Sequence, residues 1–172
     1  MAKRHIAKNN YQKLLDSIGG LLAQARQQAF QQVNSILVRT YWDVGHLIVE
    51  YENEAGENAG YGSKLFERIA ADLRKSYGKG FSRSNVIYMR LLYLKYSKSQ
   101  TLSDQLSWSH YIELLSVEDD MARSFYEKQC LMERWSVREL SRQINSMLFE
   151  RLALSKDKKR IMALAAKGQI VE

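Results

Sequence analysis

Residues 63–97 read SKLFERIAADLRKSYGKGFSRSNVIYMRLLYLKYS, and this stretch decides the fold. Apolar residues recur at steps of three and four both before Gly78 and after Ser82, which predicts helices over 63–77 and 83–97. Gly78 suits the position after a helix, because glycine enters the left-handed backbone region at little cost. Ser82 is a favoured N-cap. The stretch therefore predicts two helices joined by a short glycine-containing connection, a helix-turn-helix-like unit.

A long helix over 21–52 is expected to precede this unit, because apolar residues such as Val33, Ile36 and Val44 keep the helical spacing throughout. Its length makes it the spine of the fold. A short opening helix is expected over 9–18, ended by Gly19-Gly20.

Three further helices are expected after the quoted stretch. Ser107 opens the first, over 107–115, and Ser116 with Asp119 opens the second, which runs to 133. The pair Ser136 and Glu139 forms a capping box that opens the third, over 136–153.

The whole composition favours helices, since the 172 residues include no proline and nine glycines, whereas strand-rich folds need many turns marked by these residues. We therefore expect an all-α bundle of about six helices. Its expected divisions are an N-terminal segment (1–20), a helical domain (21–154) and a basic linker (155–172).

Charge separates along the chain, whose net charge is +7. Residues 61–98 hold nine basic and two acidic side chains, whereas 41–60 hold five carboxylates and no Lys or Arg. A basic stripe can attract a polyanion, although it is equally typical of a solvated helix surface. Apolar runs are too short for a membrane span, and the lone Cys130 excludes an internal disulfide and fits a buried residue of a cytoplasmic protein.

The basic stretch supplies the candidate nucleic-acid contacts, in two groups. Flexible cations suited to neutralising phosphates are Lys64, Arg68, Arg74, Lys75 and Lys79. Residues expected to approach bases or backbone in a groove are Arg83, Asn85 and Arg90.

Catalytic patterns are weak. His46 and Glu50 have a helical spacing that could ligate zinc, but no third ligand lies nearby in the sequence. Ser107, Ser109 and His110 include a nucleophile type and a base type, but Ser109 and His110 are adjacent and so do not face each other on a helix. A nuclease motif of the form Asp/Glu-x-Lys would follow a strand, but no strand is predicted before Asp157-Lys158-Lys159. The chain itself is therefore expected to be non-catalytic.

Four long stretches carry a family resemblance: VNSILVRTYWDVGHLIVEYE (33–52), YGSKLFERIAADLRKSYGKGFSRSNVIYMRLLY (61–93), LSWSHYIELLSV (106–117) and WSVRELSRQINSMLFERLALS (135–155). Together they resemble the N-terminal domain of the YhcG-type PD-(D/E)xK nuclease family, bacterial proteins with a domain of unknown function. The resemblance covers about residues 15–160. It implies a following C-terminal nuclease domain that holds the catalytic carboxylates, the lysine and any divalent metal.

None of those catalytic residues maps onto this chain, which is a fragment, a truncated gene or a stand-alone version. The resemblance and the basic stripe together predict a non-catalytic module that binds or targets DNA, needs no cofactor of its own and has the nuclease domain as partner. The alternative is a protein-interaction module that forms homo-oligomers or docks the nuclease domain, using residues 50–57 and 106–135.

Overall fold

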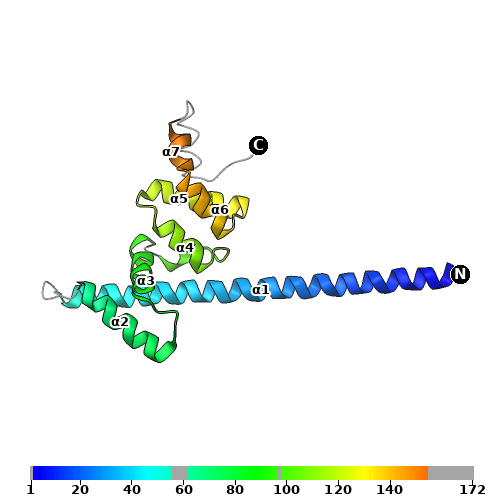
Figure 1. Ribbon diagram of the computed structural model, residues 1–172, viewed down its shortest axis with the longest axis horizontal. Helices are drawn as coiled ribbons and strands as arrows, with labels where there is room; N and C mark the ends of the chain where they lie inside the picture. The colour runs from blue at the N-terminus through cyan, green and yellow to red at the C-terminus, as the bar shows by residue number, and fades with distance from the viewer. Residues whose placement is uncertain (1, 56–61, 97, 155–172) are drawn as a thin grey trace.

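The computed structural model describes residues 2–55, 62–96 and 98–154, and these fold into helices with no strand among them. The helices are α1 (Ala2–Ala55), α2 (Gly62–Tyr77), α3 (Arg83–Lys95), α4 (Trp108–Leu115), α5 (Asp120–Glu133), α6 (Val137–Asn145) and α7 (Leu148–Ala153), with a short 3-10 helix η2 (Ser99–Thr101). The predicted all-α fold is confirmed. In Figure 1, α2 and α3 lie against the C-terminal part of α1, α4–α7 stack to one side, and the N-terminal half of α1 projects away.

The spine α1 contacts α3 most closely at Gly45. A Cβ atom at this position would lie 2.0 Å from the carbonyl oxygen of Met89 and 3.1 Å from the Cβ of Tyr93. Glycine is therefore required here by the close approach of two backbones. Ile48, one turn further along α1, is buried with Ala70 of α2 and Val86 of α3.

Aromatic side chains join α1 to the rest of the body. Tyr41 packs edge-on against Trp108 of α4, with ring centroids 4.8 Å apart. The indole Nε1 of Trp42 donates a hydrogen bond to the carbonyl oxygen of Tyr96, at 2.6 Å. Trp135 also packs against the core, so all three tryptophans belong to the core or pack against it.

Local signals place several helix ends correctly. Gly78 has φ +93° and its N–H bonds to the carbonyl of Arg74 at 3.0 Å, which confirms the predicted end of the first helix of the pair. The Ser82 hydroxyl accepts the backbone N–H of Asn85, as an N-cap should.

Three sequence expectations about helix ends are wrong. Gly19 and Gly20 do not end a helix, because α1 runs through both; each glycine lowers helix propensity without preventing continuation. The single helix predicted over 136–153 is divided into α6 and α7, because Met147 between them adopts the left-handed conformation with φ +53°. Asp119, not Ser116, caps α5. The predicted linker 155–172 lies outside the described residues.

Candidate nucleic-acid interface

The outward side of α2 carries a row of cations. At about 100° per residue, Lys64, Arg68 and Lys75 fall within about 40° of one another around the helix. All three are exposed, and no ion pair involves them among the described residues. The opposite side of α2, with Phe66 and Ala70, packs against the α1–α3 contact and so fixes which side faces outward.

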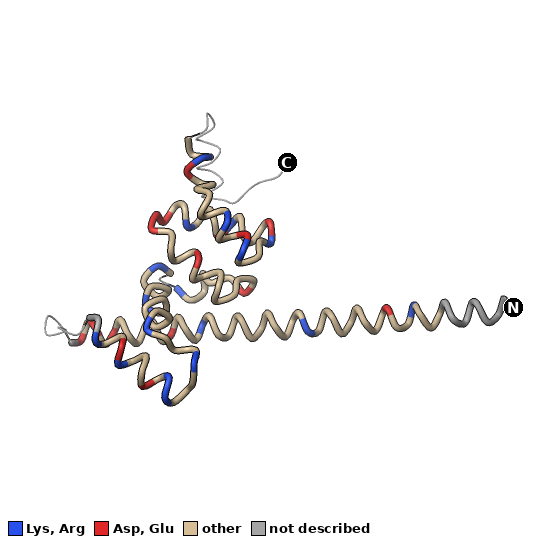
Figure 2. The backbone as a smooth tube through the Cα atoms, in the orientation of Figure 1, with Lys and Arg blue, Asp and Glu red and all other residues tan. Residues whose placement is uncertain are grey.

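Further cations gather where α2 ends. Arg74 lies in the last turn and Lys79 follows Gly78; both are exposed. Cations near a helix C-terminus are favoured by the helix dipole. Figure 2 shows Lys and Arg at this end of α2 and in its connection to α3. The structure thus brings the five predicted phosphate contacts onto α2 and its turn.

Arg83, the first residue of α3, is also exposed, but it has an acidic neighbour. Its Nε lies 3.7 Å from a carboxylate oxygen of Glu67 on α2. The two side chains are 47% and 63% exposed, so the pair is screened by water and contributes little to stability. The Arg83 guanidinium therefore stays largely accessible to solvent despite this pair.

Asn85 is committed to intramolecular hydrogen bonds. Its Nδ2 donates to the carbonyl of Gly80 at 2.6 Å, and its Oδ1 accepts the indole N–H of Trp108 at 2.8 Å. Recognition of adenine by asparagine needs both atoms of the amide. The side chain instead ties the α2–α3 connection to α4.

Arg90 is likewise engaged, because its guanidinium forms an ion pair with Glu52 near the end of α1. The side chains are 31% and 21% exposed. On the same helix Val86, Met89 and Leu92 are fully buried, and α3 has neighbours in α1, α2 and α4. This second helix of the predicted pair is thus a central packing element, with Arg83 at its accessible end.

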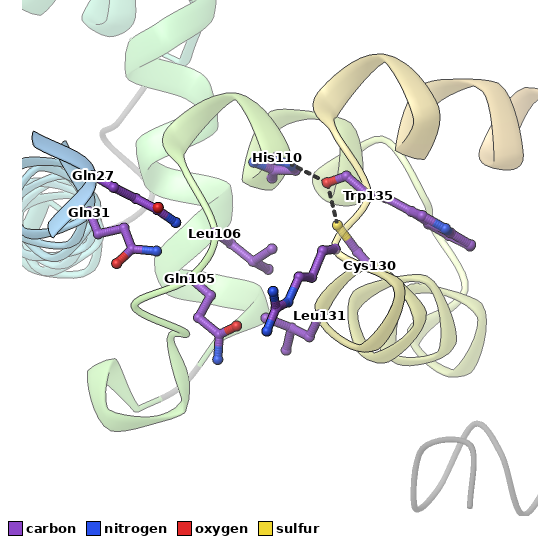
Figure 3. A pocket seen from close by; sticks show the side chains of 9 residues that line it. Gln27, Gln31, Gln105, Leu106, His110, Cys130, Leu131 and Trp135 are labelled. Atoms are coloured by element: carbon purple, nitrogen blue, oxygen red, sulfur yellow. Dashed lines mark hydrogen bonds between the residues drawn. The ribbon is translucent and has the colours of Figure 1, made fainter. Parts of the chain in front are cut away.

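A cavity of about 450 Å³ between α1, α4 and α5 was not anticipated from the sequence (Figure 3). It is lined by Gln27, Gln31, Gln105, Leu106, His110, Cys130, Leu131, Arg134 and Trp135. Burial raises the pKa of the Cys130 thiol to about 11, with the charge of Glu127 adding to this effect. The thiol is therefore protonated at neutral pH and is a poor nucleophile.

His110, beside the cavity, is held as a capping residue. Its Nε2 lies 3.1 Å from the carbonyl oxygen of Trp135, and its Nδ1 lies 2.8 Å from the hydroxyl of Ser107. Because the carbonyl requires a donor, Nε2 carries the proton and Nδ1 accepts. Burial lowers the pKa of His110, which keeps the ring neutral. The Ser107-x-x-His110 spacing is the signal that would have revealed this contact, whereas the sequence analysis considered Ser107, Ser109 and His110 only as nucleophile and base types.

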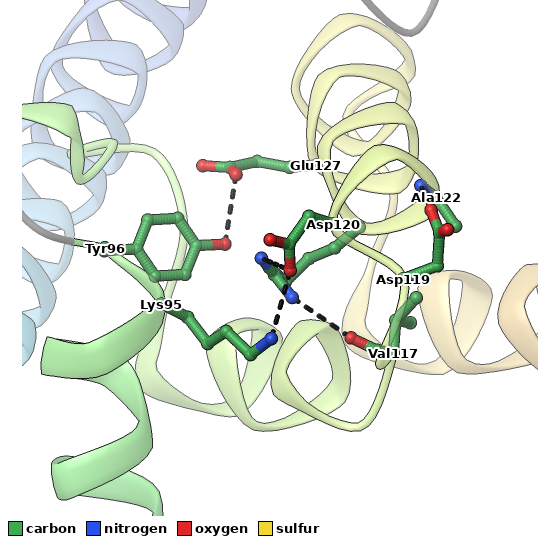
Figure 4. A network of polar contacts seen from close by, with 8 residues as sticks. Lys95, Tyr96, Val117, Asp119, Asp120, Ala122 and Glu127 are labelled. Carbon is green, nitrogen blue, oxygen red and sulfur yellow. Dashed lines mark hydrogen bonds and ion pairs between the residues drawn. The ribbon is translucent and has the colours of Figure 1, made fainter.

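A polar network ties α3 to α5 (Figure 4). The Tyr96 hydroxyl donates to Glu127 at 3.0 Å, while buried Arg123 pairs with Asp120 at 2.6 Å and donates to the carbonyl of Val117 at 3.2 Å. Burial raises the pKa of Glu127, more than the Tyr96 hydrogen bond lowers it. Every group in this network has a structural partner, so it holds helices in place.

The described ranges contain neither a cluster of side chains suited to a metal ion nor a helix suited to spanning a membrane. His46 pairs with Glu50 at 3.2 Å, and no three His, Cys, Asp or Glu side chains of the described residues are grouped to hold a metal ion. In the same part of the chain, none of the helices has the length and apolar character that crossing a bilayer would need.

Comparison with known proteins supports the resemblance seen in the sequence. The family described as "DUF1016 N-terminal domain" matches residues 17–151. A protein named "Putative nuclease YhcG" from Escherichia coli (strain K12) is 37% identical over 180 residues, covering 86% of this chain and 48% of that protein. The chain thus spans about half the length of this curated relative. No solved structure matches the chain significantly.

Proposed function

Because this chain belongs to the DUF1016 N-terminal domain family, we propose that it is the non-catalytic, nucleic-acid-binding part of a two-part cytoplasmic nuclease. Its partners are then DNA and a C-terminal nuclease domain. The relative's printed name supports the link to a nuclease, and the cations of α2 support the link to DNA.

The observation that carries the proposal is the cationic face, defined as Lys64, Arg68, Arg74, Lys75 and Lys79. All five side chains are exposed and lie on one helix and its following turn. They belong to the stretch 61–98, whose net charge of +7 equals that of the whole chain. No ion pair among the described residues involves any of these five.

Binding would work by counterion release. Each phosphate neutralised by a Lys or Arg frees condensed cations from the duplex, so affinity falls as salt rises, by about 0.9 in log–log slope per contact. Arg83 can join the face by exchanging Glu67 for a phosphate. Asn85 and Arg90 already have internal partners, so the proposal relies on the other six predicted residues. No cofactor within this chain is needed for such contacts.

A salt-titrated binding assay with a DNA duplex tests the proposal. The triple variant Arg74→Gln, Lys75→Gln, Lys79→Gln should bind more weakly and should lower the slope of log affinity against log salt by about 2 to 3. The effect should be similar for unrelated duplex sequences, because phosphate contacts carry no base information.

A matched control removes three cations elsewhere. Lys13, Arg138 and Arg151 are exposed and lie off the cationic face. Their replacement by Gln changes the net charge equally and should leave the slope nearly unchanged. Equal losses in the two triple variants would mean that only net charge matters, and an unaltered affinity of the first variant would reject this face.

A further inference from the structure

The projecting half of α1 carries an apolar stripe that no other described part of the chain covers. Every residue from 10 to 33 is exposed, and Figure 1 shows the N-terminal half of the helix projecting away from the other elements. Gln27 and Gln31, which line the cavity beside α4 and α5, lie about 160° around the helix from the stripe. The stripe consists of Tyr11, Leu15, Ile18, Leu22, Ala25, Ala29, Val33 and Ile36. Leu14 and Leu21, 54% and 67% exposed, widen it along one edge.

The spacing of the stripe is that of a helix–helix seam. From residue 11 to residue 29 the steps alternate four, three, four, three, four, which is the heptad pattern of paired helices. The small side chains of Ala25 and Ala29 would let a partner helix approach closely. The pattern therefore indicates another helix as the occupant.

The body of the same molecule cannot cover the stripe. Val38, Tyr41, Gly45 and Ile48 form the side of α1 that packs on the body. This side lies about 140° around the helix from the stripe, at about 100° per residue. The occupant must come from outside the described fold.

The area of the stripe suits a dimer. Its large members and Leu14 and Leu21 expose on the order of 900 Å² per copy, which is the upper limit of what they can bury, and a standard stable interface buries roughly 800 Å² per partner. Apolar patches on monomeric proteins rarely exceed a few hundred Å². A long solvated helix without packing is also marginal, and Gly19 and Gly20 weaken it further.

The charges beside the stripe favour a second copy over a charged partner. Between residues 10 and 36 the only ionisable side chains of Lys, Arg, Asp or Glu are Lys13, Asp16 and Arg26, whereas glutamine is frequent. Two copies therefore meet without repulsion, and glutamine amides can both donate and accept across a symmetric contact. A strongly basic or acidic partner helix would find too few opposite charges beside the stripe to pair with.

We propose that the projecting halves of two copies of this chain pair through the stripe, forming a homodimer. The proposal is independent of DNA binding, because the cationic face lies on α2 and the stripe lies on α1. The full chain of 20.0 kDa should therefore have about twice this mass in solution at micromolar concentration, by sedimentation equilibrium or light scattering.

Two double variants give a matched test. Leu15→Glu with Leu22→Glu places two charges seven residues apart within the stripe, and this variant should be monomeric. Ser17→Glu with Gln24→Glu places the same two charges at the same spacing about 120–140° around α1 from the centre of the stripe, and it should stay dimeric.

Tryptophan fluorescence separates dissociation from unfolding. Trp42, Trp108 and Trp135 all lie in the body, so their emission should be the same in both variants even if the projecting half loses helicity on dissociation. A monomeric wild type at about 100 μM, a dimeric stripe variant, or equal dissociation of both variants would each overturn the proposal. The triple variant of the cationic face should remain dimeric.

Discussion

Replacing Gly45 by alanine tests the packing of α1 on α3 most directly. The added Cβ would lie 2.0 Å from the oxygen and 2.7 Å from the carbon of the Met89 carbonyl, where ordinary contacts begin near 3.4 Å. The obstructing atoms belong to backbone, so no side chain can rotate away. The two helices must separate by about 1 Å, which loosens Val86, Met89 and Leu92 at the centre of the core.

The expected cost is large for a single methyl group. Overpacking costs about 3 kcal/mol at the upper end of its usual range, and the better helix propensity of alanine offsets about 1 kcal/mol. We expect a net loss of at least about 2 kcal/mol in the free energy of unfolding. For a chain of this size that lowers Tm by about 4 to 8 °C. Urea denaturation followed by tryptophan fluorescence measures the loss.

The same helix offers the control. An added Cβ at Gly20 would meet nothing within 4 Å, so Gly20→Ala should not destabilise the protein and should add up to about 1 kcal/mol of helix stability. A loss of stability at Gly45 without a loss at Gly20 would locate the effect in the α1–α3 contact. If Gly45→Ala matched Gly20→Ala, the reasoning about this contact would be refuted.

Two further predictions concern buried polar groups. Asn85→Ala should lower the free energy of unfolding by about 2 kcal/mol, because it leaves the Trp108 indole N–H without its acceptor. The slope of log affinity against log salt for DNA binding should not change. A lower slope with intact stability would instead assign Asn85 to DNA contact. Glu127 has a raised pKa, so the folded state binds the extra proton and wild-type stability falls as pH rises from the unfolded pKa through the folded one. The variant Glu127→Gln keeps an acceptor for the Tyr96 hydroxyl but cannot ionise. The stability of this variant relative to wild type should therefore increase as pH rises across that window, as measured by thermal denaturation at several pH values. A stability difference that is constant with pH would contradict the raised pKa.

Helix positions followed from short-range signals, and errors arose where such signals compete or are missing. Gly78 and Ser82 end and begin helices through contacts with residues three or four positions away, which a sequence displays. Gly19 and Gly20 look like a break, yet their cost is spread over a helix of 54 residues. The left-handed Met147 has no sequence signal, since side chains other than glycine rarely adopt that conformation.

The same distinction between local signals and long-range contacts applies to the residues of the candidate interface. Helical spacing sufficed to place Lys64, Arg68 and Lys75 on one side of α2. The internal commitments of Asn85 and Arg90 were hidden, because their partners Trp108 and Glu52 lie 23 and 38 positions away in the chain. Only the tertiary packing of α3 between its neighbours brings those groups together.

The uninterrupted course of α1 also fixes a length. Leu22, near the middle of the stripe, precedes Ile48, which packs beside α2, by 26 residues of continuous helix. At a rise of 1.5 Å per residue the two points are about 39 Å apart. One turn of duplex DNA is about 34–36 Å. If the chain both pairs through the stripe and binds DNA through α2, the distance along α1 between the two contacts is close to one helical turn of the duplex.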